Sequence, residues 1–281
     1  MTSNPALHAA ALSGSMDVLG YLLDHDPGSV DTLDGEGLTA LRWAVEGNQM
    51  DAARALLARG ANPNYPYPAS SGERVLIAAI LHPARSNAMV EILLQHGADP
   101  NLPDSTHYRP LERAILISHE GAVRLLVEYG AELHFSSRDP LGVMADAINH
   151  GSDPIAQFLV TQGAIYNPHG EQAHEALALA CHRGFSKTAK ELIAKGAKLD
   201  VHFEPRGLTP LMLAVERDHL ELAQYLVAVG ANVELRPRHD PHSTLFTLAG
   251  PKCHVWLSSL ENQATLDQHT PPAGASPRQR F

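Results

Sequence analysis

The sequence predicts an all-α fold assembled from a repeated pair of helices, and three features predict it. The dipeptide Gly-Ala recurs with successive glycines 37, 33, 33, 33 and 34 residues apart. An apolar block ends three residues before each of these glycines. A second apolar segment, which contains alanine, begins 19 or 21 residues before each glycine. Self-similarity at such a fixed period is the sequence signature of a repeat array.

The block before each Gly-Ala is expected to belong to a helix that buries an apolar stripe. The glycine should end that helix in a left-handed conformation, because a Cβ atom is costly at positive φ. The six blocks are Ala55-Leu56-Leu57, Ile92-Leu93-Leu94, Leu125-Leu126-Val127, Phe158-Leu159-Val160, Glu191-Leu192-Ile193 and Tyr225-Leu226-Val227. The six glycines are Gly60, Gly97, Gly130, Gly163, Gly196 and Gly230.

The earlier segment of each repeat is expected to be a short first helix. Its opening Leu or Met and the Ala three residues later share one face, and the small side chain lets the second helix approach. These segments are Leu41–Ala44, Leu76–Ala79, Leu111–Ala114, Met144–Ala147, Leu177–Ala180 and Leu211–Ala214. Cys181 follows its segment where other repeats place Val or Ile, so we expect a buried structural cysteine and not a nucleophile.

Several segments carry a closer pattern. The stretch Gly207-Leu208-Thr209-Pro210-Leu211-Met212-Leu213-Ala214, continued to Gly230-Ala231-Asn232-Val233, resembles an ankyrin repeat. The stretches 37–64 and 6–23 are similar, and the resemblance extends over about residues 5–260. It implies an ankyrin-repeat solenoid of antiparallel helix pairs joined by β-hairpin fingers, with a concave face that binds proteins.

We expect one ankyrin-repeat domain over residues 1–261 and a disordered tail over 262–281, which lacks apolar periodicity. The expected repeats are 5–33, 34–66, 67–103, 104–136, 137–169, 170–203 and 204–236, with a degenerate cap at 237–261. The first repeat and the cap lack Gly-Ala, and terminal repeats of an array are expected to be atypical. The three repeats from 104 to 203 lack the Thr-Pro pair that caps a first helix, so we expect weaker caps there.

The composition excludes several classes of function. The chain has 21 Lys and Arg against 31 Asp and Glu, a formal charge of −10, which disfavours nucleic acid and favours a basic protein partner. The one locally basic stretch, Lys187 to Lys198, is expected to be a solvated helix face. Only two cysteines, no signal segment and no membrane span predict a cytoplasmic protein. We found neither a glycine-rich phosphate loop nor a nucleophile arrangement in the sequence. We therefore expect no catalytic activity, no cofactor and no small-molecule substrate.

Partner-binding residues are predicted from one unusual finger and from the family resemblance. Tyr65 and Tyr67 lie between prolines in a lengthened finger, and either contact a partner or pack against the neighbouring finger. The resemblance implies contacts at finger tips and at the ends of first helices, where ordinary surface residues are the alternative. These candidates are Trp43, Glu46, His82, Tyr108, Leu116, Ile117, Arg138, Asp139, His150, His174, His182, Arg183, Arg206, Glu216 and Arg217. For Trp43, Leu116 and Ile117, packing between repeats is a further alternative.

One group of residues has ligand-like spacing for zinc. It comprises His239, His242, Cys253 and His254, but the gap crosses an irregular cap, and the sequence leaves open whether they bind a metal. The remaining histidines are scattered over polar positions of the repeat.

The predicted function is therefore a non-catalytic scaffold that binds a folded partner on a preformed concave face and its fingers. Such a scaffold could be an inhibitor or immunity protein against a toxic enzyme, or an adaptor. The alternatives are a secreted effector that acts on a host protein, the substrate-recruiting arm of an enzyme, and a structural array that only self-associates.

Overall fold

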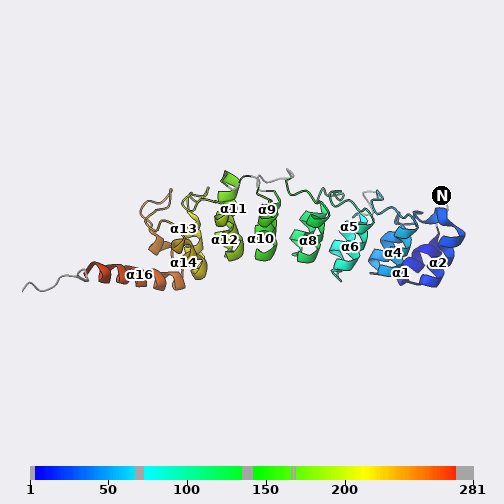
Figure 1. Ribbon diagram of the computed structural model, residues 1–281, viewed down its shortest axis with the longest axis horizontal. Coiled ribbons are helices and arrows are strands. Elements are labelled where there is room, and N and C mark those ends of the chain that lie inside the picture. The colour runs from blue at the N-terminus through cyan, green and yellow to red at the C-terminus, as the bar shows by residue number, and fades with distance from the viewer. Residues whose placement is uncertain (1–3, 67–72, 135–141, 166, 168, 270–281) are drawn as a thin grey trace, which may run out of the picture. The chain divides into compact units, whose positions relative to one another are not determined.

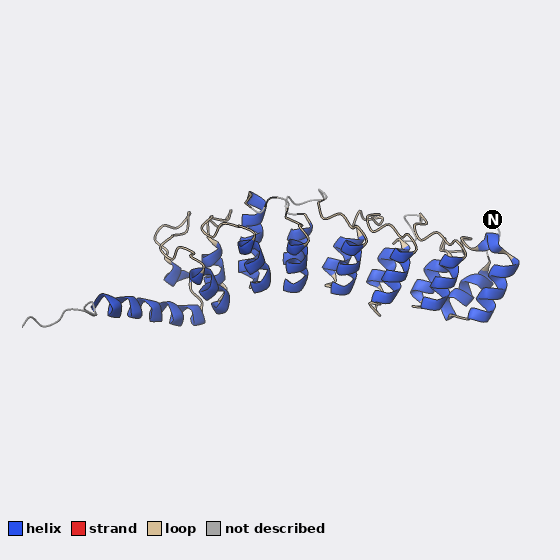
Figure 2. Cartoon of the chain, viewed as in Figure 1, coloured by secondary structure: helices blue, strands red, loops and turns tan. Residues whose placement is uncertain are grey.

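The computed structural model describes residues 4–66, 73–134, 142–165, 167 and 169–269. The chain divides into two compact units, Met1–Tyr166 (unit 1) and Asn167–Phe281 (unit 2). Within the described residues every regular element is a helix, and Figure 2 shows loops but no strand between them. The predicted all-α class of helix pairs is confirmed.

In the part of unit 1 that the structure describes, five helix pairs follow one another, and Figure 1 shows them side by side in chain order. The first helices of the pairs pack against each other in one row, and the second helices pack in another. The pairs are α1 (Pro5–Ser13) with α2 (Met16–His25), α3 (Ala40–Glu46) with α4 (Met50–Ala58), α5 (Val75–Leu81) with α6 (Asn87–Gln95), α7 (Pro110–Leu116) with α8 (Glu120–Glu128), and α9 (Val143–Asn149) with α10 (Asp153–Thr161). A short 3-10 helix, η1 (Pro27–Ser29), follows α2.

The described residues of unit 2 form three further pairs. They are α11 (Glu171–Arg183) with α12 (Ser186–Ala194), α13 (Pro210–Glu216) with α14 (Leu220–Ala228), and α15 (Leu245–Leu248) with α16 (Pro251–His269). Helix α11 has 13 residues where the first helices α3, α5, α7, α9 and α13 each have 7. Its first turns occupy the stretch that forms a finger in other repeats, because the sequence 171–176 lacks the Asp and Gly that start a turn.

The C-terminal boundary differs from the prediction. The tail was expected to begin at residue 262, but α16 continues to His269, so residues 262–269 are helical. Residues 261–266 read Glu-Asn-Gln-Ala-Thr-Leu, which are compatible with a helix, and the glycine stop of other repeats is missing. Residues 270–281 lie outside the described residues.

The glycine stops have the predicted geometry. Their φ values are +90°, +85°, +89°, +88°, +104° and +101° at Gly60, Gly97, Gly130, Gly163, Gly196 and Gly230. At the end of α8, Gly130 N donates to the Val127 carbonyl at 3.1 Å and Ala131 N donates to the Leu126 carbonyl at 2.8 Å. This pair of bonds is a Schellman motif, which satisfies carbonyls that the helix end leaves without partners.

The core lies between the two helix rows of each unit. In the second helices the central leucine of each predicted block, including Leu126, is at most 1% exposed. The alanine of each first helix is equally buried, which confirms that the small side chain faces the packed interior. Cys181 is fully buried, and burial raises the pKa of its thiol far above the usual value, so it is a structural residue as predicted.

The helix caps follow the sequence pattern. Thr39 and Thr209 accept a hydrogen bond at 3.3 Å from the backbone nitrogen three residues later, at the starts of α3 and α13. Helices α9 and α11 begin after glycines and have no side-chain cap, as expected for the middle repeats. At α7 the carboxylate of Glu112 compensates in part, because it accepts from Arg109 N at 2.7 Å.

Asparagine side chains join consecutive repeats of unit 1. The amide of Asn64 donates to the Gly97 carbonyl at 2.8 Å and accepts from Asp99 N at 2.8 Å. Asn101 repeats this arrangement with Gly130 at 3.1 Å and Glu132 at 2.8 Å. Each carboxamide uses its donor and its acceptor together, so it fixes the next repeat at the point where its second helix ends.

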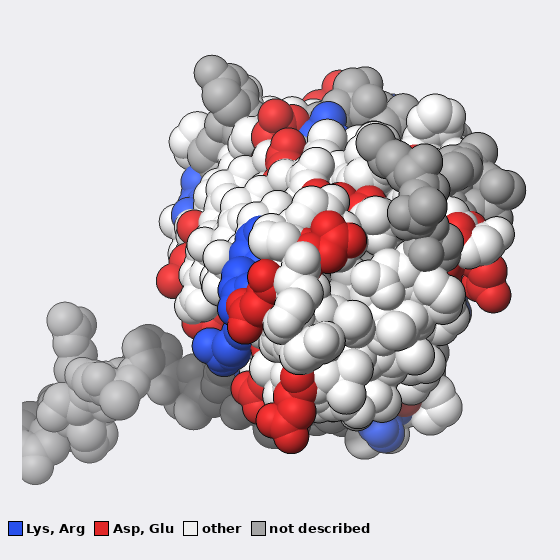
Figure 3. All heavy atoms as spheres, turned by 90° about the vertical axis from the view of Figure 1, so that its right-hand side faces the viewer, with Lys and Arg blue, Asp and Glu red and all other residues white. Residues whose placement is uncertain are grey.

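The end of unit 1 that carries α1 and α2 is rich in exposed apolar side chains. Leu12 and Met16 are each 40% exposed and Tyr21 is 61% exposed, with its ring stacked on His25 at 4.0 Å between centroids. Figure 3 views this end and shows a broad area without charged side chains. The first repeat therefore differs from the others in two ways: it lacks the Gly-Ala stop, and it exposes an apolar face.

Candidate functional site

Two fingers of unit 1, those before α3 and α7, are closed turns that an aspartate organises. In the finger before α7, Asp104 N donates to the Tyr108 carbonyl at 2.9 Å, and the buried Asp104 carboxylate accepts from Thr106 N at 2.8 Å and Tyr108 N at 3.0 Å. Arg113, on α7, donates its Nε to the same carboxylate at 2.8 Å. Burial raises the pKa of Asp104, but these hydrogen bonds outweigh it and bring the pKa below the usual value.

The finger before α3 has the same construction. Asp34 N donates to the Leu38 carbonyl at 3.0 Å, and Asp34 accepts from Leu38 N at 2.9 Å. Trp43 occupies the position of Arg113 and donates its indole Nε1 to Asp34 at 2.5 Å. The structure thus places the half-buried Trp43 as the anchor of its finger, a role that the sequence analysis did not consider. The missed signal is an aspartate nine residues before a side-chain donor.

The predicted hairpins are closed by backbone bonds and not by extended strands. In unit 2 the finger before α13 shows the one isolated antiparallel bridge of the described residues, between Phe203 and Leu208, with Phe203 N donating at 2.8 Å. In unit 1 the Asp34–Leu38 and Asp104–Tyr108 bonds have the same place in their fingers. Figure 2 shows these finger loops along one edge of the helix pairs of unit 1.

Among the predicted finger residues, two tyrosines are described in unit 1. Tyr108 is half-buried, and the guanidinium of Arg113 lies 4.5 Å from its ring centroid. Tyr65 is also half-buried, and its backbone nitrogen donates to the Asn62 carbonyl at 3.3 Å. Tyr67, Arg138 and Asp139 lie outside the described residues.

The ends of the first helices in unit 1 carry both polar and apolar side chains. His82 donates its Nε2 to the Glu46 carbonyl at 3.2 Å, so neighbouring helix ends are tied together there. The exposed side chain of Glu46 forms an ion pair with Arg42 of the same helix. Leu116 and Ile117 are half-buried at the end of α7. His150 is exposed, and its carbonyl accepts from Ser118 Oγ at 3.3 Å.

In unit 2 five predicted residues meet at the ends of α11 and α13. We call them the arginine cluster: His182, Arg183, Arg206, Glu216 and Arg217. Arg206, in the finger before α13, binds both carboxylate oxygens of Glu216, with one of the two contacts at 2.7 Å. Arg217 donates its Nε to His182 Nε2 at 2.9 Å.

The electrostatics of the arginine cluster follow from these contacts. The hydrogen bond from Arg206 holds the pKa of Glu216 below its usual value. Burial, followed by the positive charges of Arg217, Arg206 and Arg183, lowers the pKa of His182. Because Arg217 Nε is a donor, His182 Nε2 must accept, so the imidazole is neutral and carries its proton on Nδ1.

His174 lies apart from the cluster, in the early turns of α11. It lines a cavity of about 270 Å³ together with Glu171, Glu175 and the finger residues 201–204. Its Nε2 is buried without a hydrogen-bond partner, and burial lowers its pKa, as does the charge of Lys198.

The candidate zinc residues are engaged separately. His239 bonds to Glu204 at 2.8 Å, and His254 packs on the ring of Phe246 with 3.9 Å between centroids. Cys253 is buried, and burial raises the pKa of its thiol to about 11. Across the described ranges, no three His, Cys, Asp or Glu side chains are arranged to hold a metal ion.

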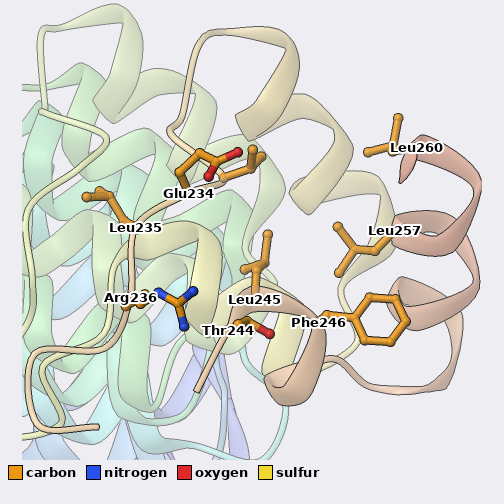
Figure 4. A pocket seen from close by; sticks show the side chains of 9 residues that line it. Glu234, Leu235, Arg236, Thr244, Leu245, Phe246, Leu257 and Leu260 are labelled. Atoms are coloured by element: carbon orange, nitrogen blue, oxygen red, sulfur yellow. The ribbon is translucent and has the colours of Figure 1, made fainter. Parts of the chain in front are cut away.

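A groove that the sequence did not predict lies at the C-terminal end of unit 2. Figure 4 shows Leu245 and Phe246 of α15 and Leu257 and Leu260 of α16 around it. The segment 233–236 and Thr244 complete the lining of this cavity of about 380 Å³. The groove therefore lies on α15 and α16, the last helix pair that the structure describes.

No helix in the described part of the chain is long and apolar enough to cross a membrane. Cys181 is buried and His182 accepts a hydrogen bond from Arg217, so these two neighbours do not form a nucleophile and base pair. The candidate site consists of side chains on fingers and first-helix ends.

Comparison with known proteins agrees with this architecture. The family described as "Ankyrin repeats (3 copies)" matches residues 2–67 and 144–236, and the family described as "Ankyrin repeat" matches residues 72–105. A crystallised ankyrin repeat domain from Acinetobacter baumannii AYE has 25% sequence identity and a TM-score of 0.56, and the alignment covers 68% of this chain and 98% of that one.

Two similar proteins are much longer. An ankyrin repeat and KH domain-containing protein of Caenorhabditis briggsae is 29% identical over 143 residues, which are 50% of this chain and 5% of that protein. The E3 ubiquitin-protein ligase KEG of Arabidopsis thaliana is 23% identical over 261 residues, which are 84% of this chain and 15% of that protein. The chain thus spans a small part of the length of either relative.

Proposed function

Because the chain belongs to the ankyrin-repeat family, whose repeats form protein-interaction scaffolds, we propose that it binds one folded partner protein through its fingers and first-helix ends. The observation that carries this proposal is the fixed geometry of the fingers. Asp34 and Asp104 tie each finger to its own first helix by several hydrogen bonds. A surface that is already ordered loses little conformational entropy on binding.

The partner is proposed to be basic, and the chain to act as an inhibitor, an immunity protein or an adaptor. The formal charge of −10 supports a basic partner, because opposite charge accelerates encounter. A secreted effector that acts on a host protein has the same physics and remains the alternative. Cytoplasmic localisation is part of the same proposal and follows from the sparse cysteines.

A second candidate function is the substrate-recruiting arm of a longer enzyme. The relative named as an E3 ubiquitin-protein ligase favours it, because the aligned region is only 15% of that protein. The chain alone would then bind protein without turnover, as in the main proposal. The distinction comes from the partner: an arm retains its partner only until the partner is modified, whereas an inhibitor abolishes the partner's activity in a stoichiometric mixture.

Affinity purification of the tagged chain followed by mass spectrometry tests the scaffold proposal. We expect one protein to copurify reproducibly and to bind the purified chain directly. Incubation with nucleotides and common esters should give no turnover. A chain that binds no protein, or that turns over one of these substrates, contradicts the proposal.

The double variant Tyr65→Ala/Tyr67→Ala tests the lengthened finger. Helical circular dichroism and the melting temperature should stay nearly unchanged while binding of the copurified partner weakens, because tyrosines in a finger supply contact area at low entropic cost. The variant Tyr129→Ala, at an exposed position on the second-helix side, is the matched control. Intact binding in the double variant would remove this finger from the interface.

A further inference from the structure

The net charge of the chain is distributed very unevenly. Residues 1–166, which form unit 1, contain 9 Arg and no Lys against 19 Asp and Glu, a formal charge of −10. Residues 167–281, which form unit 2, contain 12 Lys and Arg against 12 Asp and Glu. The whole negative charge therefore belongs to unit 1, so the argument for a basic partner does not extend to unit 2.

Within unit 2 the arginine cluster is a local excess of positive charge at predicted interface positions. It contains three guanidinium groups and one carboxylate, and Arg206 already engages that carboxylate, Glu216. Arg183 and Arg217 are exposed, and neither forms an ion pair with any carboxylate that the structure describes. The guanidinium of Arg183 lies 5.9 Å from the ring centroid of Phe185.

The position of Arg217 is fixed by a neutral acceptor. His182 accepts the hydrogen bond from Arg217 Nε and carries no negative charge. This contact therefore does not neutralise the positive charge of the Arg217 guanidinium, and its Nη groups can still bind an anion. The backbone of His182 is tied to the next repeat, because its carbonyl accepts from His219 Nε2 at 3.2 Å. A guanidinium that is held in place and lacks a carboxylate is preorganised for a bidentate bond to one.

We propose that the arginine cluster binds an acidic segment of the partner protein, with Arg183 and Arg217 each receiving an Asp or Glu carboxylate. This inference rests on the proposed scaffold function and names the chemistry of one part of the partner. The partner is then asymmetric in charge, basic where it meets unit 1 and acidic where it meets the cluster. The scaffold proposal already supplies a protein partner, so an acidic protein segment is favoured over a nucleic acid, and the test below includes an oligonucleotide as the alternative.

The test measures binding of a fluorescein-labelled peptide of Asp and Glu to the full chain by anisotropy. An Asn/Gln peptide of the same length and a single-stranded DNA oligonucleotide are run in parallel. The variants are Arg183→Glu/Arg217→Glu and the milder Arg183→Gln/Arg217→Gln. The matched control is Lys190→Glu/Lys195→Glu on the second-helix side of the same unit, where Lys190 packs over Tyr225 and Lys195 lies 3.9 Å from Glu191.

We expect the acidic peptide to bind more tightly than the Asn/Gln peptide, and the affinity to fall with added salt. The arginine reversal should weaken it by about tenfold or more, and the lysine control should change it by less than about twofold. The Gln variant should show an intermediate loss with unchanged circular dichroism. Equal binding of the two peptides, equal losses in both reversals, or tighter binding of the oligonucleotide would each overturn the inference.

The copurified partner separates this inference from the scaffold proposal. If the arginine reversal leaves partner binding intact while Tyr65→Ala/Tyr67→Ala abolishes it, the cluster is not an acidic subsite and the scaffold stands. If the wild-type chain binds no protein at all, the scaffold proposal fails first. Partner binding that the arginine reversal weakens, and the lysine control does not, supports both.

Discussion

Gly97 offers a clean measurement of what the glycine stops contribute to stability. It follows α6 with φ of +85°, and its nitrogen and that of Ala98 donate to the carbonyls of Leu94 and Leu93 at 3.0 Å each. A Cβ atom built at Gly97 meets no heavy atom within 4 Å, so Gly97→Ala adds no steric clash. The cost is the left-handed backbone alone, and we expect the free energy of unfolding to fall by about 1–2 kcal/mol.

Gly20 is the matched control, because the same substitution should have the opposite sign there. It lies inside α2, has no positive φ and also has open space around its Cβ position. Gly20→Ala should raise the free energy of unfolding by about 0.5–1 kcal/mol, since glycine in a helix interior loses more backbone entropy than alanine. Both positions belong to unit 1.

Urea denaturation followed by far-UV circular dichroism measures both effects as shifts of the midpoint at constant m value. Gly97→Asn should lose less than Gly97→Ala, because Asn tolerates the left-handed region better. A midpoint that Gly97→Ala leaves unchanged, or that both alanine variants move in the same direction, would refute the account of the stops.

Three further substitutions test other parts of unit 1. Leu126→Ala removes a fully buried side chain and should lower the free energy of unfolding by about 2–5 kcal/mol, with exposed Val18→Ala as its control in the same denaturation assay. Asn101→Ala removes two hydrogen bonds to the next repeat and should lower the free energy of unfolding by about 1–2 kcal/mol. Asn101→Asp keeps the hydrogen bond from Glu132 N and should lose less, and equal losses in the two variants would contradict the role of Asn101 in joining the repeats. Burial lowers the pKa of His119, so the folded state binds its proton less readily than the unfolded chain, and stability should decline as pH falls below about 6.5. His119→Gln should flatten that decline in thermal melts across this range, and an identical profile would exclude the imidazole as its cause.

Much of the fold could be predicted because the same sequence pattern recurs in several repeats. The glycine at +85° after α6 and its equivalents follow from Gly-Ala and the apolar block alone. The length of α11 was missed, because the absence of turn residues before Ala176 is a weaker signal than the presence of Thr and Pro. The extension of α16 was missed for the same reason, since the prediction ended the helix where the period ended.

The candidate site was predicted as positions and not as contacts. The positions of Arg183 and Arg217 at the ends of first helices could be read from the repeat. Their grouping with Arg206 could not, because it depends on how far the finger before α13 reaches back toward Glu216. The role of Trp43 was missed because its partner, Asp34, lies in the finger, where the apolar period of the helices gives no information.

The two aspartate-closed turns differ in the residues that they present. Asp34 is followed by Gly-Glu-Gly and Asp104 by Ser-Thr-His, yet both turns close with the same backbone bond and the same donor position on the helix behind them. The three residues at the exposed tip can therefore differ in sequence while the backbone closure of the turn stays the same. Binding specificity in such a chain can therefore change by substitution of three residues, without a change in the conformation of the loop.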